Sequence, residues 1–261
     1  MMSGHGSTVS DNEFSGNEGG EGGGIWAASG YVEIRHNVVT GNHAASGGGV
    51  YLNRSGPLTN NDISNNQATD GGGVWATELC TLTGNRLAGN VAADRGGGLY
   101  WERGTGTFRR NTFWGNQATT GGAVYANLPT DTGVFEENTV LDNLASGDGG
   151  GIYVTFMGTL TLTNNILADN GAGVHGDQLY LFAWWPTLTA SLRHNTFAHR
   201  ALGDEAIFVG DNTDLTMANN MVVSHTVGLM AGGAGLRVVA DHTFFALNGD
   251  DVRTNITSTY S

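Results

Sequence analysis

The sequence predicts an all-β fold, a single-stranded parallel β-helix solenoid of about ten coils with a period near 25 residues. Three observations predict it: a recurring pair of asparagines, a recurring glycine run that ends in an aliphatic and an aromatic residue, and short bursts of alternating apolar and polar residues. Such alternation indicates short strands. Long stretches with a helical spacing of apolar residues do not occur in the sequence, and the glycine runs would break such helices.

The first part of each repeat reads asparagine, four residues, asparagine. Asparagine tolerates left-handed backbone geometry, and its amide can bond to the asparagine one coil away. We therefore expect a hydrogen-bonded ladder at one corner, in which Asn61, Asn85, Asn111 and Asn138 stack. The pairs are Asn12/Asn17, Asn37/Asn42, Asn61/Asn66, Asn85/Asn90, Asn111/Asn116, Asn138/Asn143 and Asn165/Asn170, followed by the degenerate Asn195/Arg200, Asn220/His225 and His242/Leu247.

The second part of each repeat is a glycine run followed by an aliphatic and an aromatic residue. Glycine is suited to positions where the chain turns with positive φ or packs tightly. The aliphatic residue should face the core, and the aromatic residue after it should then face outward. The aromatic positions are Trp26, Tyr51, Trp75, Tyr100, Tyr125, Tyr153 and Tyr180, with Phe208 in the next repeat.

These columns predict three segments: an N-terminal lead-in at residues 1–7, a parallel β-helix at 8–247, and a C-terminal tail or terminal cap at 248–261. We expect about three short strands in each coil, stacked at roughly 4.8 Å. The first coil begins abruptly, so we expect the N-terminal edge to be the less protected one. The start of the chain shows no basic segment followed by an apolar one, which predicts no signal peptide in this chain.

The composition excludes several classes of protein. The chain has 261 residues, of which 43 are Gly and only 3 are Pro, so it lacks the proline content of a collagen. The net charge is −13, and all 11 basic residues are arginine. An acidic field repels phosphate backbones, so the sequence predicts no nucleic-acid partner. No apolar run reaches the length of a membrane span. The single cysteine, Cys80, is interpreted as a buried small hydrophobic residue.

The paired motifs resemble the repeat of chlamydial polymorphic outer-membrane proteins and related bacterial surface proteins. The residues that carry the resemblance are Phe14-Ser15-Gly16-Asn17, Phe113-Trp114-Gly115-Asn116 and Gly121-Gly122-Ala123-Val124. The resemblance covers most of the chain and implies a right-handed parallel β-helix of the pectate-lyase-like type. It also implies a secreted or cell-surface bacterial protein with an adhesin-like role, of which this chain would be a fragment beside neighbouring domains.

A carbohydrate-active enzyme, such as a polysaccharide lyase or glycoside hydrolase, is the alternative function. Such sites need clustered carboxylates. The equivalent positions of successive repeats hold few carboxylates. The Arg109/Glu136 pair is interpreted as an ion pair between coils rather than a catalytic pair. Asp211, Asp214, Asp250 and Asp251 could bind Ca²⁺ but lack its ligand spacing. We therefore predict no catalytic residues, no metal ligands and no cofactor.

The aromatic column is the candidate binding site. The sequence leaves two interpretations open: a stacked ladder that only stabilises one face, or an exposed strip that binds a glycan or a protein surface. Two adjacent tryptophans on the longest insertion favour binding, because both cannot face a core from one strand. The predicted ligand-binding residues are Trp26, Tyr51, Trp75, Tyr100, Tyr125, Tyr153, Tyr180, Trp184 and Trp185.

Overall fold

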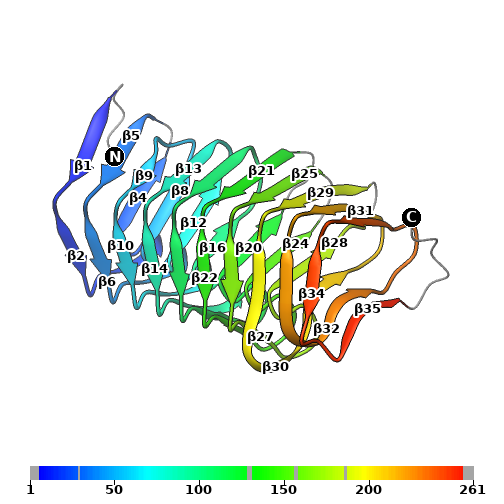
Figure 1. Ribbon diagram of the computed structural model, residues 1–261. Coiled ribbons are helices and arrows are strands. Elements are labelled where there is room, and N and C mark those ends of the chain that lie inside the picture. Colours follow the sequence, from blue (N-terminus) through cyan, green and yellow to red (C-terminus); the bar gives the residue numbers. More distant parts are fainter. Residues whose placement is uncertain (1–5, 29, 128–130, 156–157, 185–186, 255–261) are drawn as a thin grey trace.

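The chain forms a parallel β-solenoid in which each coil stacks on the one before it (Figure 1). The computed structural model describes residues 6–28, 30–127, 131–155, 158–184 and 187–254. Every strand pairing in the described residues is parallel, and partners are one coil apart in sequence. The predicted all-β parallel solenoid with a period near 25 residues is confirmed.

The strands form four rows along the solenoid axis. The first row precedes the first asparagine corner and is a 10-stranded sheet. It consists of β1 (Ser7–Ser10), β5 (Val32–Arg35), β9 (Leu58–Thr59), β13 (Cys80–Thr83), β17 (Gly106–Arg109), β21 (Asp131–Glu136), β25 (Gly158–Thr163), β29 (Leu188–Arg193), β31 (Thr213–Ala218) and β33 (Arg237–Asp241).

The second row lies between the two asparagine corners. It consists of β2 (Glu13–Ser15), β6 (Val38–Thr40), β10 (Asp62–Ser64), β14 (Arg86–Ala88), β18 (Thr112–Trp114), β22 (Thr139–Leu141), β26 (Ile166–Ala168), the start of β30 (Thr196–Val209), the start of β32 (Met221–Ala231) and β34 (Phe244–Ala246). Each of its first seven strands has only three residues, because the two corners lie five residues apart.

The third row follows the second corner and ends after seven coils. It consists of β3 (Glu18–Glu21), β7 (His43–Ser46), β11 (Gln67–Asp70), β15 (Val91–Arg95), β19 (Gln117–Ala118), β23 (Leu144–Ala145) and β27 (Gly171–Ala172). The fourth row carries the aromatic column. It consists of β4 (Ile25–Ala28), β8 (Val50–Asn53), β12 (Val74–Thr77), β16 (Leu99–Trp101), β20 (Val124–Asn127), β24 (Ile152–Thr155), β28 (Leu179–Phe182), the ends of β30 and β32, and β35 (Asp250–Thr254).

The first seven coils therefore have four strands each, instead of the three expected. The eighth and ninth coils differ, because Arg200 and His225 replace the second asparagine. Without that corner the chain runs on as the single long strands β30 and β32, which join the second and fourth rows into one 18-stranded sheet. β35 lies in the segment that the sequence assigns to a tail or terminal cap and pairs with β32.

Two asparagine ladders, buried beyond their exposed first rungs, line the corners. The first has nine asparagines, from Asn12 to Asn220, and eight side-chain N–H···Oδ1 bonds of 3.0–3.1 Å join each one to the next. The second runs from Asn17 to Asn170, whose amide then donates to Gln178 Oε1 at 2.6 Å. The predicted ladder of Asn61, Asn85, Asn111 and Asn138 is confirmed.

Two details of the corners differ from expectation. The left-handed residue is the one before each asparagine, such as His36 with φ 55° and Arg110 with φ 54°, which leaves the asparagine side chain pointing inward. In the tenth coil the corners fall on Thr243 and Asn248, one residue later than His242 and Leu247: Met221 pairs with Phe244, and His225 N–H donates to Asn248 Oδ1 at 3.0 Å. The pairing of β34 with β32 sets this register. Because Thr243 stands at the first corner in place of asparagine, the repeat pattern does not reveal the shift.

The core is a single column of apolar side chains, which come mainly from the first, second and fourth rows. Its largest member, Trp101, is fully buried and packs edge-on against Phe108 at 5.0 Å. A Cβ atom at Gly106 or Gly133 would lie 2.7–2.8 Å from the Trp101 ring, so both glycines make room for it. Cys80 is buried in the same core, as predicted.

The glycine runs do both things that the sequence predicted. The first glycine of each run turns with positive φ, as at Gly47 with φ 63°. The next one packs against neighbouring coils: a Cβ atom at Gly48 would lie 2.3 Å from the Gln67 carbonyl oxygen and 2.5 Å from that of Gly72. The turn brings the end of the third row beside the start of the fourth.

Candidate functional site: an aromatic strip on the fourth row

The aromatic residues of the fourth row stack face to face along the solenoid axis. The ring centroids lie 4.3 Å apart for Tyr51 and Trp75, 6.1 Å for Trp75 and Tyr100, and 5.3 Å for Tyr100 and Tyr125. The stack continues through Tyr153 and Tyr180 to Phe208 at 4.7–5.0 Å. The aliphatic residue before each ring is buried in the core, so the rings lie on the outer face, as expected.

Stacking determines which part of each ring is accessible. Inside the stack the ring faces cover one another, and only edges and hydroxyl groups can reach solvent. The N-terminal end of the column is the more open one: Trp26 is 41% exposed, whereas Tyr100 in the middle is 4% exposed and Phe208 at the other end is 8% exposed. A planar ligand or sugar ring therefore finds a free ring face at Trp26, and ring edges along the rest of the strip.

Trp184 lies on the insertion after Phe182 and is 69% exposed. Its ring meets Phe182 edge-on at 5.1 Å, and Phe182 contacts Tyr180 at 6.5 Å. This chain of rings connects the insertion to the strip. Trp185, the other predicted tryptophan, lies outside the described residues.

A row of polar residues borders the strip on the side of the third row. It comprises the residue before each glycine turn, namely Glu21, Ser46, Asp70, Arg95, Thr120, Asp148 and His175. The Arg95 guanidinium lies 4.8 Å from the Tyr100 ring and makes two hydrogen bonds with Asp70, at 2.8 and 2.9 Å. Glu21 accepts a hydrogen bond from Trp26 Nε1 at 2.9 Å.

At the C-terminal end of this border, His175 stacks on Phe208 at 4.5 Å and lies 3.1 Å from Glu205 Oε2. Burial raises the pKa of Asp148. Burial likewise raises the pKa of Tyr100, to about 12, so the phenol stays protonated and can donate a hydrogen bond at neutral pH.

A second polar row borders the strip on its other side. It holds the residue two positions after each ring, namely Asn53, Thr77, Glu102, Asn127 and Thr155. Thr77 Oγ1 and Asn127 Oδ1 are buried atoms for which the described residues supply no hydrogen-bond partner. The strip is thus a floor of ring edges between two rows of hydroxyl, amide and carboxylate groups.

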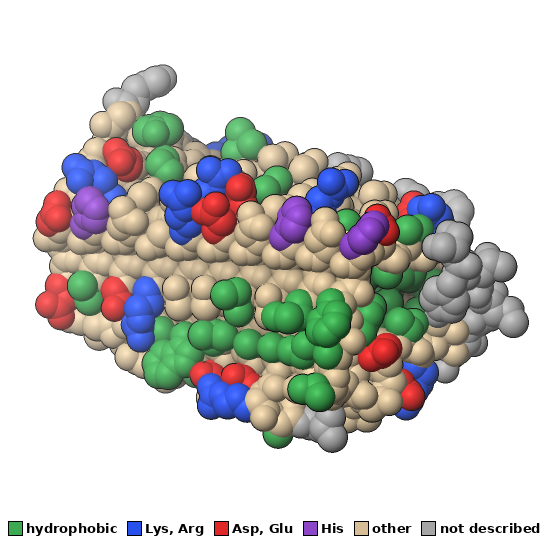
Figure 2. Space-filling view, in the orientation of Figure 1, with side chains coloured by type: hydrophobic (Ala, Val, Ile, Leu, Met, Phe, Trp, Pro, Cys, Tyr) green, Lys and Arg blue, Asp and Glu red, His purple; other side chains and the backbone are tan. Residues whose placement is uncertain are grey.

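The other candidate features lie elsewhere. Arg109 and Glu136 form an ion pair between β17 and β21 on the first row. Asp214 pairs with Arg237 at 3.2 Å, and Asp250 pairs with Arg253. The described part of the chain holds no group of three His, Cys, Asp or Glu side chains placed to bind a metal ion. On the face in Figure 2, acidic and basic side chains often lie next to each other, which matches such pairs.

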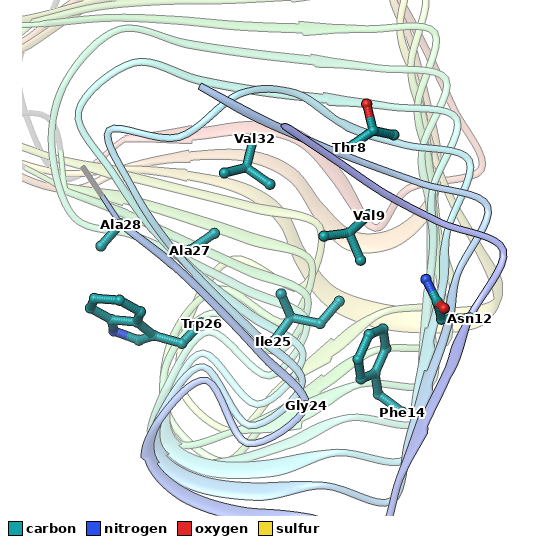
Figure 3. Close-up of a pocket in the computed structure, with 10 residues that line it drawn as sticks. All are labelled: Thr8, Val9, Asn12, Phe14, Gly24, Ile25, Trp26, Ala27, Ala28 and Val32. Atoms are coloured by element: carbon teal, nitrogen blue, oxygen red, sulfur yellow. The ribbon is translucent and has the colours of Figure 1, made fainter. Parts of the chain in front are cut away.

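Sequence reasoning did not identify a hollow of about 430 Å³ at the N-terminal end of the core. Figure 3 shows Val9, Phe14, Ile25 and Val32 projecting into it, while Trp26 lies outside the ring of strands. The hollow is the interior of the first coil, where one more coil would pack. Whether this edge is the less protected one depends on residues 1–6, of which 1–5 lie outside the described residues, so that expectation stays a prediction. No helix in the described residues is long and apolar enough to cross a membrane.

Comparison with known proteins found two family models that match parts of the chain. Residues 1–127 match the model described as periplasmic copper-binding protein (NosD). Residues 79–179 match the model described as right handed beta helix region. The comparison with curated proteins found no match, and neither did the comparison with solved structures. The second model confirms the expected handedness.

The NosD description raises the question of copper. Copper prefers His, Cys and Met side chains. In the described part of residues 1–127, these types are His36, His43 and Cys80. His36 and His43 are exposed and lie on different corners, and Cys80 is buried in the core. These residues do not fit a copper centre. The chain is therefore a right-handed parallel β-helix protein whose first 127 residues are similar to the NosD family.

Proposed function

We propose that this chain is a non-catalytic binding scaffold that holds a glycan chain along the aromatic strip of the fourth row. The observation that carries the proposal is the continuous stack from Tyr51 to Phe208 between two polar rows. Its groups repeat once per coil, and a polymer of sugars presents hydroxyl groups at a similarly regular spacing. Ring edges give apolar contact, while the polar rows supply hydrogen bonds that fix orientation.

Trp26 and Trp184 extend the proposed site at its two ends. Both have exposed rings that can stack on the apolar face of a sugar, which the covered faces inside the stack cannot do. The net charge of −13 disfavours long polyanions. The expected ligand is a largely neutral glycan held weakly at several coils.

An extracytoplasmic location supports this role. The similarity of residues 1–127 to a family described as periplasmic is consistent with it. The resemblance of the repeats to those of chlamydial polymorphic outer-membrane proteins favours a secreted or cell-surface protein with an adhesin-like role.

The test removes the hydroxyl groups of three half-buried tyrosines and keeps the stack. The triple variant Tyr125→Phe, Tyr153→Phe and Tyr180→Phe should stay folded by circular dichroism and lose most binding on a glycan array. The control is Trp114→Ser, because Trp114 is an exposed ring on the second row, away from the strip. Unchanged binding in the triple variant would refute the proposal.

A more severe variant, Trp75→Ser with Tyr100→Ser and Tyr125→Ser, separates binding from stability. If this variant stays folded and every partner still binds, the ladder has no binding role. If it unfolds, the ladder is primarily a stabilising stack.

Two alternatives are outcomes of the same experiments. Loss of binding to a protein rather than to glycans would assign the strip to a protein partner. Depolymerisation of uronic-acid polymers would instead support a polysaccharide lyase. We expect none, because the polar row two positions after the rings holds a single carboxylate, Glu102, and Asp70 in the other row is already paired with Arg95.

A further inference from the structure

We infer that a turn beside the strip is a carboxylate-binding anchor, so that the bound glycan carries an acidic sugar at this point. The inference rests on the proposed function and adds that one sugar of the bound glycan carries a negative charge. The anchor comprises Arg54, Glu78 and Arg103, each three residues after a ring of the stack, namely Tyr51, Trp75 and Tyr100. They come from three consecutive coils.

The backbone places these side chains at the same turn. Arg54 and Glu78 both have positive φ, at 51° and 65°, immediately after β8 and β12. In the next coil Gly104 takes this position with φ 91°, and a Cβ atom there would lie 2.2 Å from the Glu78 carbonyl oxygen. Arg103, one residue earlier, therefore supplies the side chain.

A cavity of about 320 Å³ lies at this turn, lined by Arg54, Ser55, Glu78 and Leu79. Leu79 is 72% exposed and gives the cavity an apolar wall. Beneath the turn, the buried Thr77 Oγ1 has no hydrogen-bond partner in the described residues. The cavity thus combines charged groups, an apolar wall and a size that suits one sugar residue.

Two arginines at the anchor share one carboxylate oxygen. Arg54 Nη2 and Arg103 Nε lie 3.6 and 3.5 Å from the same oxygen, Glu78 Oε1, so two guanidinium groups share one carboxylate at long distance. Other arginines that form ion pairs do so with acids of their own: Arg35 with Glu33, Arg86 with Asp62, Arg95 with Asp70, Arg109 with Glu136, Arg110 with Glu137, Arg200 with Asp142 and Asp169, Arg237 with Asp214, and Arg253 with Asp250.

The unused donors at this turn match a carboxylate. A guanidinium binds carboxylate oxygens through two parallel N–H bonds, and among the described residues Arg54 and Arg103 have only the long ion pairs with Glu78. Burial raises the pKa of Tyr51, Glu21 and Glu102 raise it further, and Arg103 lowers it, so charges at this turn act on the strip itself. The two guanidinium groups can bind one ligand carboxylate through hydrogen bonds, whereas the overall acidic field still repels a long polyanion.

The test compares two probes and three proteins by isothermal titration calorimetry. The probes are an oligosaccharide of neutral sugars ending in one glucuronate, and the same molecule with that carboxylate methyl-esterified. The proteins are the wild type, the double variant Arg54→Gln with Arg103→Gln, and the control Arg193→Gln. Arg193 suits this purpose because it is exposed and lies on the first row, outside the strip.

Wild type and the Arg193→Gln variant should bind the acid at least about tenfold more tightly than the ester at low salt, and high salt should shrink the difference. The double variant should bind both probes equally. The inference is wrong if the wild type binds acid and ester alike, or if the double variant still prefers the acid.

These outcomes also distinguish the anchor from the strip. Equal binding of both probes to the wild type, lost in the triple Tyr→Phe variant, would refute the anchor and keep the strip. Absence of binding of either probe to any protein would refute both.

Discussion

The Asn85 side-chain amide donates to Asn111 Oδ1 at 3.1 Å, and the Asn85 backbone N–H donates to the same oxygen at 2.9 Å. One carbonyl oxygen thus satisfies two buried donors from the coil before it. The same pair of bonds joins Asn61 to Asn85. Each asparagine is therefore both acceptor for one neighbour and donor to the next, which gives the corner its fixed register.

Asn85→Ala should destabilise the protein by about 1–3 kcal/mol, because the two N–H groups of Asn61 would lose their acceptor inside the core. Denaturant unfolding measures the change. The control is Asn12→Ala at the exposed first rung, which should cost less because water can reach its partners. Equal effects of the two variants would contradict this prediction.

Gly48→Ala should destabilise the protein by about 1–3 kcal/mol, because its Cβ atom would collide with backbone carbonyl oxygens. Unlike a side chain, these oxygens cannot move aside by changing rotamer. Gly20→Ala is the matched control: Gly20 is exposed on β3, and its Cβ atom would have no neighbour within 4 Å. Thermal unfolding should show a lower midpoint for the first variant only. A similar midpoint for both would mean that the coils can separate at this corner.

Stability should fall in acid because of His225. Its ring is fully buried, and its Nε2 lies 3.3 Å from Gln178 Nε2. Burial, aided by nearby His199, lowers its pKa to about 4, while a hydrogen bond with the Val223 backbone and the charge of Asp169 act in the opposite direction. Because the unfolded chain binds the proton first, this contribution is complete above pH of about 6.5 and is lost as pH falls toward 4, by about 3 kcal/mol.

Unfolding free energies measured between pH 7.5 and 4 check this prediction. His225→Asn should flatten the profile, since asparagine does not titrate and is the residue of this corner in the first seven coils. His36→Asn, at an exposed corner, should leave the slope unchanged. A His225→Asn profile as steep as that of the wild type would assign the acid sensitivity to other groups.

Cys80 should be unreactive in the folded protein. It is buried in the core, and burial raises the pKa of its thiol, so the thiolate that reacts with disulfide reagents is scarce. Labelling should proceed only as the protein unfolds and should follow the loss of circular dichroism with denaturant. Rapid labelling under native conditions would show that β13 opens locally.

The aromatic strip could be located from the sequence, but its accessible surface could not. Alternation places Tyr51 and Tyr100 on the outer face once Val50 and Leu99 are known to face the core. Their exposure depends on the rings above and below and on Arg95, which approaches the Tyr100 ring from the adjoining row. The ligand-binding role assigned to these residues stays a prediction.

The sequence by itself determined the parallel solenoid, its period, its asparagine ladders and its glycine turns, because each is a local requirement repeated in every coil. The tertiary structure decided what depends on a neighbouring coil. It merged two rows in β30 and β32 where Arg200 and His225 replace asparagine, and it placed the last corner at Asn248. It also brought Arg54 and Arg103, two coils apart in the chain, to one shared carboxylate. Such contacts depend on stacking register and side-chain direction, which one repeat does not encode alone.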